Sequence, residues 1–190
     1  KFMPKIIDHF IKLYNEILNL IDWRAVMKHK YGMSDDEIEY AVKNYSKLYS
    51  QKGKEMFTVY DGIYDALREL KKSGFKLAIA TQKHRMFTTD ILETYEASDV
   101  FDAVCATDVG TNLTKSHLLL QACEQTGVSV EESILVGDST IEAKGAEEIG
   151  MDFLAVLYGW GFKTKEETEE YKCVGTVSSP AEISQKVMAL

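Results

Sequence analysis

The chain has 190 residues, of which 45% are hydrophobic and 27% charged, a composition typical of a globular fold and not of a disordered chain. Its formal net charge of −8 argues against nucleic acid or an anionic membrane as a partner, because either would need a basic surface. No apolar run reaches the roughly 20 residues that span a bilayer, no signal-peptide pattern opens the chain, and the cysteines form no CxxC pair. We therefore expect a soluble, cytoplasmic protein.

The N-terminal third of the chain has the pattern of helices. Apolar residues recur at spacings of three and four over residues 10–21, as on one face of an amphipathic helix. A second helix is predicted over residues 34–53, with Ser34 as its N-cap, acidic residues in its first turn and a glycine at its far end. No strand pattern precedes residue 55, so we predict a small all-helical domain over residues 1–56.

Beyond residue 56, short apolar strands alternate with amphipathic helices. Helices are predicted over residues 59–74, 86–97, 114–127, 139–150 and 180–190, and strands over residues 75–81, 101–107, 132–137 and 152–158. This alternation is typical of a doubly wound parallel sheet with helices on both faces. We therefore predict an α/β core domain over residues 57–190.

Ligands of a doubly wound sheet bind beyond the carboxyl ends of its strands. The hydroxyl of Thr81 and the N–H groups near Gln82 can hold anionic oxygens, and Lys115 can neutralise charge that develops in a transition state. Asp138 and Glu142 lie one helical turn apart and can offer oxygen ligands to a hard cation such as Mg²⁺. Together these residues suggest phosphoryl transfer.

Each of these residues also has a purely structural interpretation. Asp138 can be the N-cap of the helix that follows it, and Glu142 is favourable in a first turn because of the helix dipole. Threonine is common in strands, and Lys115 can be a solvated side chain at a helix start. The functional interpretation depends on the occurrence of Thr81, Lys115 and Asp138 together, in order, at strand ends.

Four segments carry a wider pattern: KLAIATQK (76–83), TNLTKSHLL (111–119), ILVGDSTIEAKGAEEIG (134–150) and AVLYGWGFKTKEE (155–167). They resemble motifs of the haloacid dehalogenase superfamily of phosphatases, particularly its phosphoglycolate-phosphatase-like branch with a helical cap. The resemblance extends into KHKYGMSDDEIEYAVKNY (28–45) and covers most of residues 25–175. It implies a small helical cap domain on a Rossmann-type core.

The resemblance implies a Mg²⁺-dependent phosphatase that acts on a small phosphorylated metabolite through a phospho-aspartyl intermediate. Thr81 and the backbone of Gln82 would hold the phosphoryl oxygens, and Lys115 would neutralise the nucleophile and the phosphate. Asp138 would bind Mg²⁺ together with Glu142, which stands where the family usually has aspartate. The helical cap would close over the site and select the substrate.

The strand that carries the superfamily's nucleophile ends in D-x-D, and no D-x-D occurs in this sequence. Asp8 follows a short apolar pair, but Phe10 stands two positions on and the segment continues as a helix, so we do not assign Asp8 as the nucleophile. The resemblance places the absent strand between those that end at Thr81 and Gly137. We therefore expect these 190 residues to be inactive alone, and a longer native chain or another segment to fill the gap.

Two other function classes remain as alternatives. A non-catalytic relative would bind a phosphorylated ligand or a protein partner; the missing D-x-D favours this class, whereas the joint presence of Thr81, Lys115 and Asp138 disfavours it. A nucleotide-binding protein of the doubly wound type has less support, because no glycine-rich phosphate loop is present.

Overall fold

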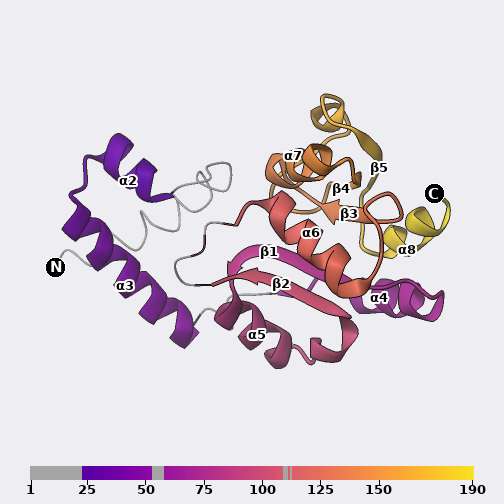
Figure 1. Ribbon diagram of the computed structural model, residues 1–190, viewed down its shortest axis with the longest axis horizontal. Coiled ribbons are helices and arrows are strands. Elements are labelled where there is room, and N and C mark those ends of the chain that lie inside the picture. The colour runs from indigo at the N-terminus through magenta and orange to yellow at the C-terminus, as the bar shows by residue number, and fades with distance from the viewer. Residues whose placement is uncertain (1–22, 53–57, 109–110, 112) are drawn as a thin grey trace. The chain divides into compact units, whose positions relative to one another are not determined.

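The computed structural model describes residues 23–52, 58–108, 111 and 113–190. The chain divides into two compact units, Lys1–Gly53 and Lys54–Leu190. Among the described residues, the first unit is helical and the second combines helices with parallel strands (Figure 1). The helix predicted over residues 10–21 lies outside the described residues. No helix in the described part of the chain is long and apolar enough to cross a membrane.

The first unit contains α2 (Trp23–Tyr31) and α3 (Asp35–Lys52). As predicted, Ser34 precedes α3 as its cap: its hydroxyl accepts a hydrogen bond from the N–H of Glu37 at 3.3 Å. In return, the carboxylate of Glu37 accepts hydrogen bonds from the N–H and from the hydroxyl of Ser34, each at 2.8 Å, and these two bonds lower the pKa of Glu37. The two helices bury a small apolar cluster of Met27, Ile38 and Ala41.

The second unit follows the predicted strand–helix alternation. Its described strands are β1 (Ala78–His84), β2 (Ala103–Thr107), β3 (Ile134–Gly137), β4 (Asp152–Val156) and β5 (Cys173–Val177). Its described helices are α4 (Ile63–Lys72), α5 (Arg85–Thr94), α6 (Lys115–Thr126), α7 (Thr140–Ile149) and α8 (Ala181–Met188), with short 3-10 helices η2 (Ser98–Val100) and η3 (Glu166–Thr168).

Two strands differ from the prediction. β1 begins and ends three residues later than predicted, so Thr81, the last residue of the predicted strand, and Gln82, which was expected to follow it, both lie within β1. Its pairing with β2 is irregular between Thr81 and His84, and the strand continues past its regular ladder there. β5 is missing from the prediction because its five residues include Gly175 and have neither polar alternation nor a long apolar run.

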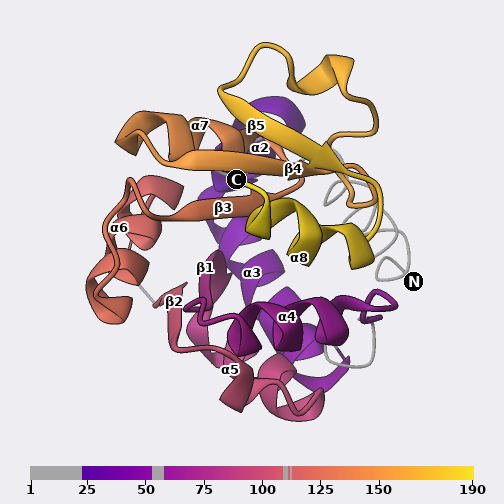
Figure 2. The ribbon, with the colours of Figure 1, turned by 90° about the vertical axis from the view of Figure 1, so that its right-hand side faces the viewer.

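The strands form two parallel sheets, β1-β2 and β3-β4-β5 (Figure 2). Among the described residues, β1 and β3 are not hydrogen-bonded to each other. The break between the sheets therefore falls where the resemblance places the absent D-x-D strand. α6 contacts both strands of the first sheet and also packs on α7, which contacts β3 and β4, and so it connects the two sheets.

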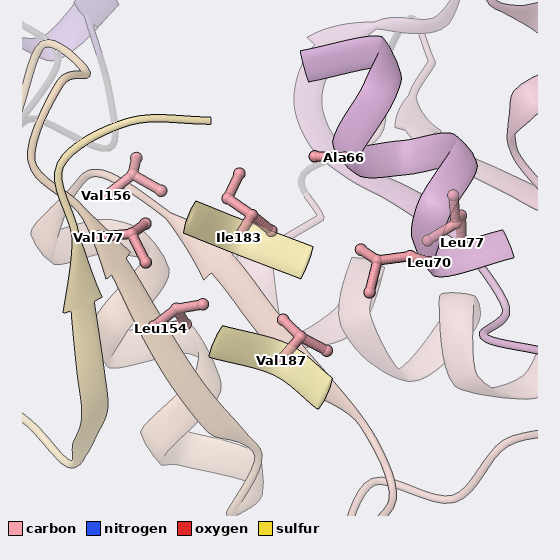
Figure 3. Close-up of a cluster of buried hydrophobic side chains, with 8 residues drawn as sticks. All are labelled: Ala66, Leu70, Leu77, Leu154, Val156, Val177, Ile183 and Val187. Carbon is pink, nitrogen blue, oxygen red and sulfur yellow. The ribbon is translucent and has the colours of Figure 1, made fainter. Parts of the chain in front are cut away.

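Helices cover both faces of the second sheet, as predicted for a doubly wound fold. Successive side chains of β4 point to opposite faces: Leu154 and Val156 to one, Phe153 and Ala155 to the other. On the first face, α4 and α8 complete the cluster of Ala66, Leu70, Leu77, Leu154, Val156, Val177, Ile183 and Val187 (Figure 3). On the opposite face, α6 and α7 contribute Leu119, Ala143 and Ala146.

Candidate active site

Lys115 is the first residue of α6 and is buried, with 8% of its surface exposed. Its ammonium donates a hydrogen bond to the carbonyl oxygen of Ala80 in β1 at 2.8 Å and lies 3.4 Å from Oε1 of Glu142 in α7. The backbone of Gly145 is close to the stem of the lysine, because a Cβ at position 145 would lie 2.6 Å from Cγ of Lys115. The alternative of a solvated lysine is therefore wrong.

Glu142 forms a capping box at the start of α7. Its Oε2 accepts the N–H of Ser139 at 3.0 Å, the hydroxyl of Ser139 at 2.9 Å and the N–H of Asp138 at 3.0 Å. The structural interpretation of Glu142 as a first-turn acid thus describes most of its contacts. The N-cap of α7 is Ser139, so the alternative that Asp138 is the N-cap is wrong.

The side chain of Asp138 binds a loop from elsewhere in the chain. Its Oδ2 accepts hydrogen bonds from the backbone N–H groups of Trp160 and Gly161, the latter at 3.0 Å. Its carbonyl oxygen accepts the N–H of Phe162 at 2.6 Å. The residue after β3 is therefore fixed to the segment after β4, which sequence analysis places at the same edge of the sheet.

Thr81 and Gln82 lie in the irregular last part of β1. The hydroxyl of Thr81 accepts the N–H of Lys83 at 3.1 Å, and burial lowers the pKa of the Lys83 ammonium. The side chain of Gln82 donates to the carbonyl oxygen of Leu113 at 3.1 Å. The side chain of Gln82 is thus directed at the segment that leads into α6.

These contacts connect the predicted site residues in one network. Ala80, the neighbour of Thr81, is bonded to Lys115; Lys115 is paired with Glu142; and Glu142 is bonded to the backbone of Asp138. Thr81 and Gln82 are linked to this network through the backbone of β1, because they directly follow Ala80 in that strand. The arrangement places the buried ammonium of Lys115 beside the carboxylate of Glu142 and next to the strand residue that precedes Thr81. Buried positive charge of this kind can stabilise negative charge on a phosphoryl group.

Comparison with known proteins identifies the family. The family model of haloacid dehalogenase-like hydrolases matches residues 8–156, which is most of the chain. The chain belongs to the haloacid dehalogenase-like hydrolase family.

Its relatives include phosphatases. The chain is 28% identical over 131 residues to a phosphoglycolate phosphatase from Psychrobacter arcticus, covering 68% of this chain and 57% of that protein. It is 29% identical over 142 residues to the pyrophosphatase PpaX from Bacillus cereus, covering 74% of this chain and 64% of that protein. A crystal structure of a predicted phosphatase from Clostridium acetobutylicum is similar with a TM-score of 0.77 and 28% identity, over 87% of this chain and 76% of that one. The chain spans less than two thirds of the length of these two curated relatives.

The haloacid dehalogenase-like site fits a hard cation in part. Both side-chain hydrogen bonds that Asp138 accepts from described residues reach Oδ2, which leaves Oδ1 for a cation. Glu142 fits less well, because its Oε2 accepts three hydrogen bonds and its Oε1 faces Lys115. In the part of the chain that the structure describes, no three acidic, histidine or cysteine side chains gather around one point. Of these two residues, Asp138 is therefore the one that could hold a cation such as Mg²⁺.

Two features of the site were missed by sequence reasoning. Tyr60, which precedes α4, packs edge-on against Tyr158 with ring centroids 4.9 Å apart. Burial, with contributions from Tyr60 and Asp138, raises the pKa of Tyr158 to about 12. The other missed feature is the pair of amides at Trp160 and Gly161. The alternation of glycine with aromatic residues at 158–161 indicates a tight loop there, but it does not indicate that the loop binds Asp138.

Proposed function

We propose that this protein is a Mg²⁺-dependent phosphatase of the haloacid dehalogenase-like family and that its substrate is a small phosphorylated metabolite. The observation that carries the proposal is the burial of Lys115 between the carboxylate of Glu142 and the carbonyl oxygen of Ala80. Ala80 is the residue that directly precedes Thr81. An ammonium removed from water costs several kcal/mol unless negative charge surrounds it. Glu142 supplies one such charge, and an arriving phosphoryl group would add more.

Thr81, Gln82 and Lys115 would each have a separate role in binding and transferring the phosphoryl group. The hydroxyl of Thr81 uses a lone pair to accept the N–H of Lys83, so its own proton is available to a phosphoryl oxygen. The backbone N–H of Gln82 would hold a second oxygen, and Lys115 would neutralise the charge that develops during transfer. The acceptor would be an aspartate carboxylate from outside the described residues. Its attack would break the P–O bond to the substrate's leaving group, which would depart as an alcohol or as phosphate. Water would then hydrolyse the phospho-aspartyl group, releasing phosphate and restoring the carboxylate.

Asp138 would hold Mg²⁺ through Oδ1, with Glu142 acting beside it. The ion supplies charge neutralisation and orients the phosphoryl oxygens. The remaining ligands would come from water and from substrate oxygens, as is usual for this ion. The helical unit that ends at Gly53 would be the cap of the enzyme, in keeping with the resemblance of residues 28–45.

The names of the relatives support the substrate class. One is a phosphoglycolate phosphatase and another a pyrophosphatase, so both act on small molecules that carry a phosphoryl group. Phosphoglycolate and pyrophosphate are therefore the first substrates to test, followed by sugar phosphates and nucleotides.

The test is phosphate release by the protein expressed from its complete gene, with and without Mg²⁺. We expect Mg²⁺-dependent turnover that falls about a hundredfold or more in Asp138→Asn, because a group that orients charge in the transition state is lost. Asp152→Asn is the matched control, since Asp152 is the first residue of β4 and pairs with Lys172 at 3.6 Å. Full activity of Asp138→Asn, or no turnover of any phosphoryl compound, would overturn the proposal and favour a non-catalytic binding protein.

A further inference from the structure

The loop after β4 makes three hydrogen bonds to one residue, Asp138. The N–H groups of Trp160 and Gly161 donate to Oδ2 of its carboxylate, and the N–H of Phe162 donates to its carbonyl oxygen at 2.6 Å. Hydrogen bonds to a carboxylate are roughly twice as strong as those between neutral groups. Three consecutive amides thus converge on the residue that follows β3.

Core packing also holds this loop, apart from its hydrogen bonds to Asp138. The side chain of Phe162 is buried, with 4% of its surface exposed, and packs against Phe153 and Tyr171 at centroid distances of 6.3 and 5.7 Å. The ammonium of Lys163 also donates to the carbonyl oxygen of Gly159. The side chain of Trp160, in contrast, is 74% exposed and does little to hold the loop. The loop that carries the amides is therefore anchored in the core through Phe162.

The glycines of the loop are required by this contact. Gly159 and Gly161 do not have the positive φ angles that favour glycine, so an alanine could adopt their backbone conformations. A Cβ at position 159 would lie 2.6 Å from Cγ of Asp138, and one at position 161 would lie 2.9 Å from its carbonyl carbon. Only a residue without a side chain lets the loop approach Asp138 this closely.

We propose that the 159–162 loop is a positioning element for Asp138: its amides bind Oδ2 and thereby direct Oδ1 at the cation. This inference rests on the proposed function, because it takes Asp138 to be a residue that holds Mg²⁺. Groups that orient a metal-binding side chain contribute about 10- to 100-fold to metal affinity. Gly159 and Gly161 are positioning residues in this sense, since they would act on the cation through Asp138.

The test is Mn²⁺ binding, measured from the electron paramagnetic resonance signal of the free ion, in the protein expressed from its complete gene. We expect Gly161→Ala and Gly159→Ala to weaken Mn²⁺ binding about 10- to 100-fold. Lys165→Ala, an exposed change just beyond the loop, should bind as the wild type does. Trp160→Ala keeps the amide and should also bind normally; a loss as large as that of the glycine variants would overturn the role of the amides.

A second measurement does not require the glycine variants to fold. In ¹⁵N spectra without metal, the amide protons of Trp160 and Gly161 should lie downfield and move upfield in Asp138→Ala. Unchanged resonances, or glycine variants that bind Mn²⁺ as tightly as the wild type, would overturn the proposal. No Mn²⁺ binding by the wild type would overturn it together with the metal site of the proposed function. Loss of phosphatase activity with Mn²⁺ binding intact would count against the proposed function alone.

Discussion

The ammonium of Lys115 lies 3.4 Å from Oε1 of Glu142, and the two side chains join the first turns of α6 and α7. They are 9% and 23% exposed, so the pair is largely removed from water. Lys115 also donates to the carbonyl oxygen of Ala80, while Glu142 accepts the N–H of Asp138. The pair therefore connects β1 of one sheet with the residue that follows β3 of the other.

We expect Lys115→Met to lower the free energy of unfolding by about 2 kcal/mol. Breaking a buried pair commonly costs about 3–5 kcal/mol, but Glu142 keeps three other hydrogen bonds, which reduces the loss. Urea denaturation of this variant, of Glu142→Gln and of the double variant should give a coupling of about 1 kcal/mol or more. Lys144→Met, an exposed change in α7, is the control. A coupling near zero would show that the two side chains do not stabilise each other.

Glu142 should also stabilise α7 through its capping box, apart from its pairing with Lys115. Glu142→Gln keeps an oxygen that can accept the N–H groups of Ser139 and Asp138, whereas Glu142→Ala removes it. We therefore expect the alanine variant to be less stable than the glutamine variant by about 1 kcal/mol. Thermal melts followed by circular dichroism measure the difference. The same two changes at Glu147, which is exposed on α7, should give stabilities close to each other; equal stabilities at position 142 would contradict the capping role.

The arrangement of the sheets predicts where amide hydrogen exchange is slowest. β4 is paired on both sides, and Phe153, Leu154 and Ala155 are at most 1% exposed. β1 and β3 each have one partner strand among the described residues. We expect the amides of β4 to exchange most slowly in the 190-residue chain, and those of β1 and β3 faster. Equal protection of β1 and β4 would indicate that a further segment pairs with the edge of β1.

The fold could be predicted from the sequence because its signals are local. Apolar runs between turn residues predicted β2, β3 and β4, and helical periodicity predicted the helices that cover them. β5 could not be predicted in this way, since its five residues are short, contain Gly175 and receive their order from pairing with β4. The extension of β1 to His84 likewise depends on an irregular pairing with β2, which no local pattern reports.

The site could be predicted only in outline. The sequence singles out residues near strand ends as candidates, but their contacts depend on segments far apart in the chain. The burial of Lys115 requires the close packing of α6 on Gly145 of α7, and the amides that bind Asp138 follow it by 22 and 23 residues. The capping role of Glu142 was weighed as an alternative, because a helix start can be recognised locally.

Tyr158 should make stability depend on pH in the alkaline range. Burial raises its pKa from 10.0 to about 12, with smaller contributions from Tyr60 and from the charge of Asp138. Between these values the unfolded chain has lost the phenol proton while the folded protein still holds it, so the unfolded state binds fewer protons. The free energy of unfolding is therefore unaffected by Tyr158 below about pH 10, falls as the pH rises toward about 12 and levels off above it.

Urea denaturation at a series of pH values from 8 to the alkaline limit of the fold measures this dependence. Tyr158→Phe keeps the edge-on ring contact with Tyr60 but has no proton to lose, so its stability should fall less steeply above about pH 10. Tyr40→Phe, at a position that is 63% exposed, should follow the wild type. If the wild type and Tyr158→Phe lose stability in parallel, the phenol of Tyr158 is not protected by burial and ionises as freely in the folded protein as in the unfolded chain.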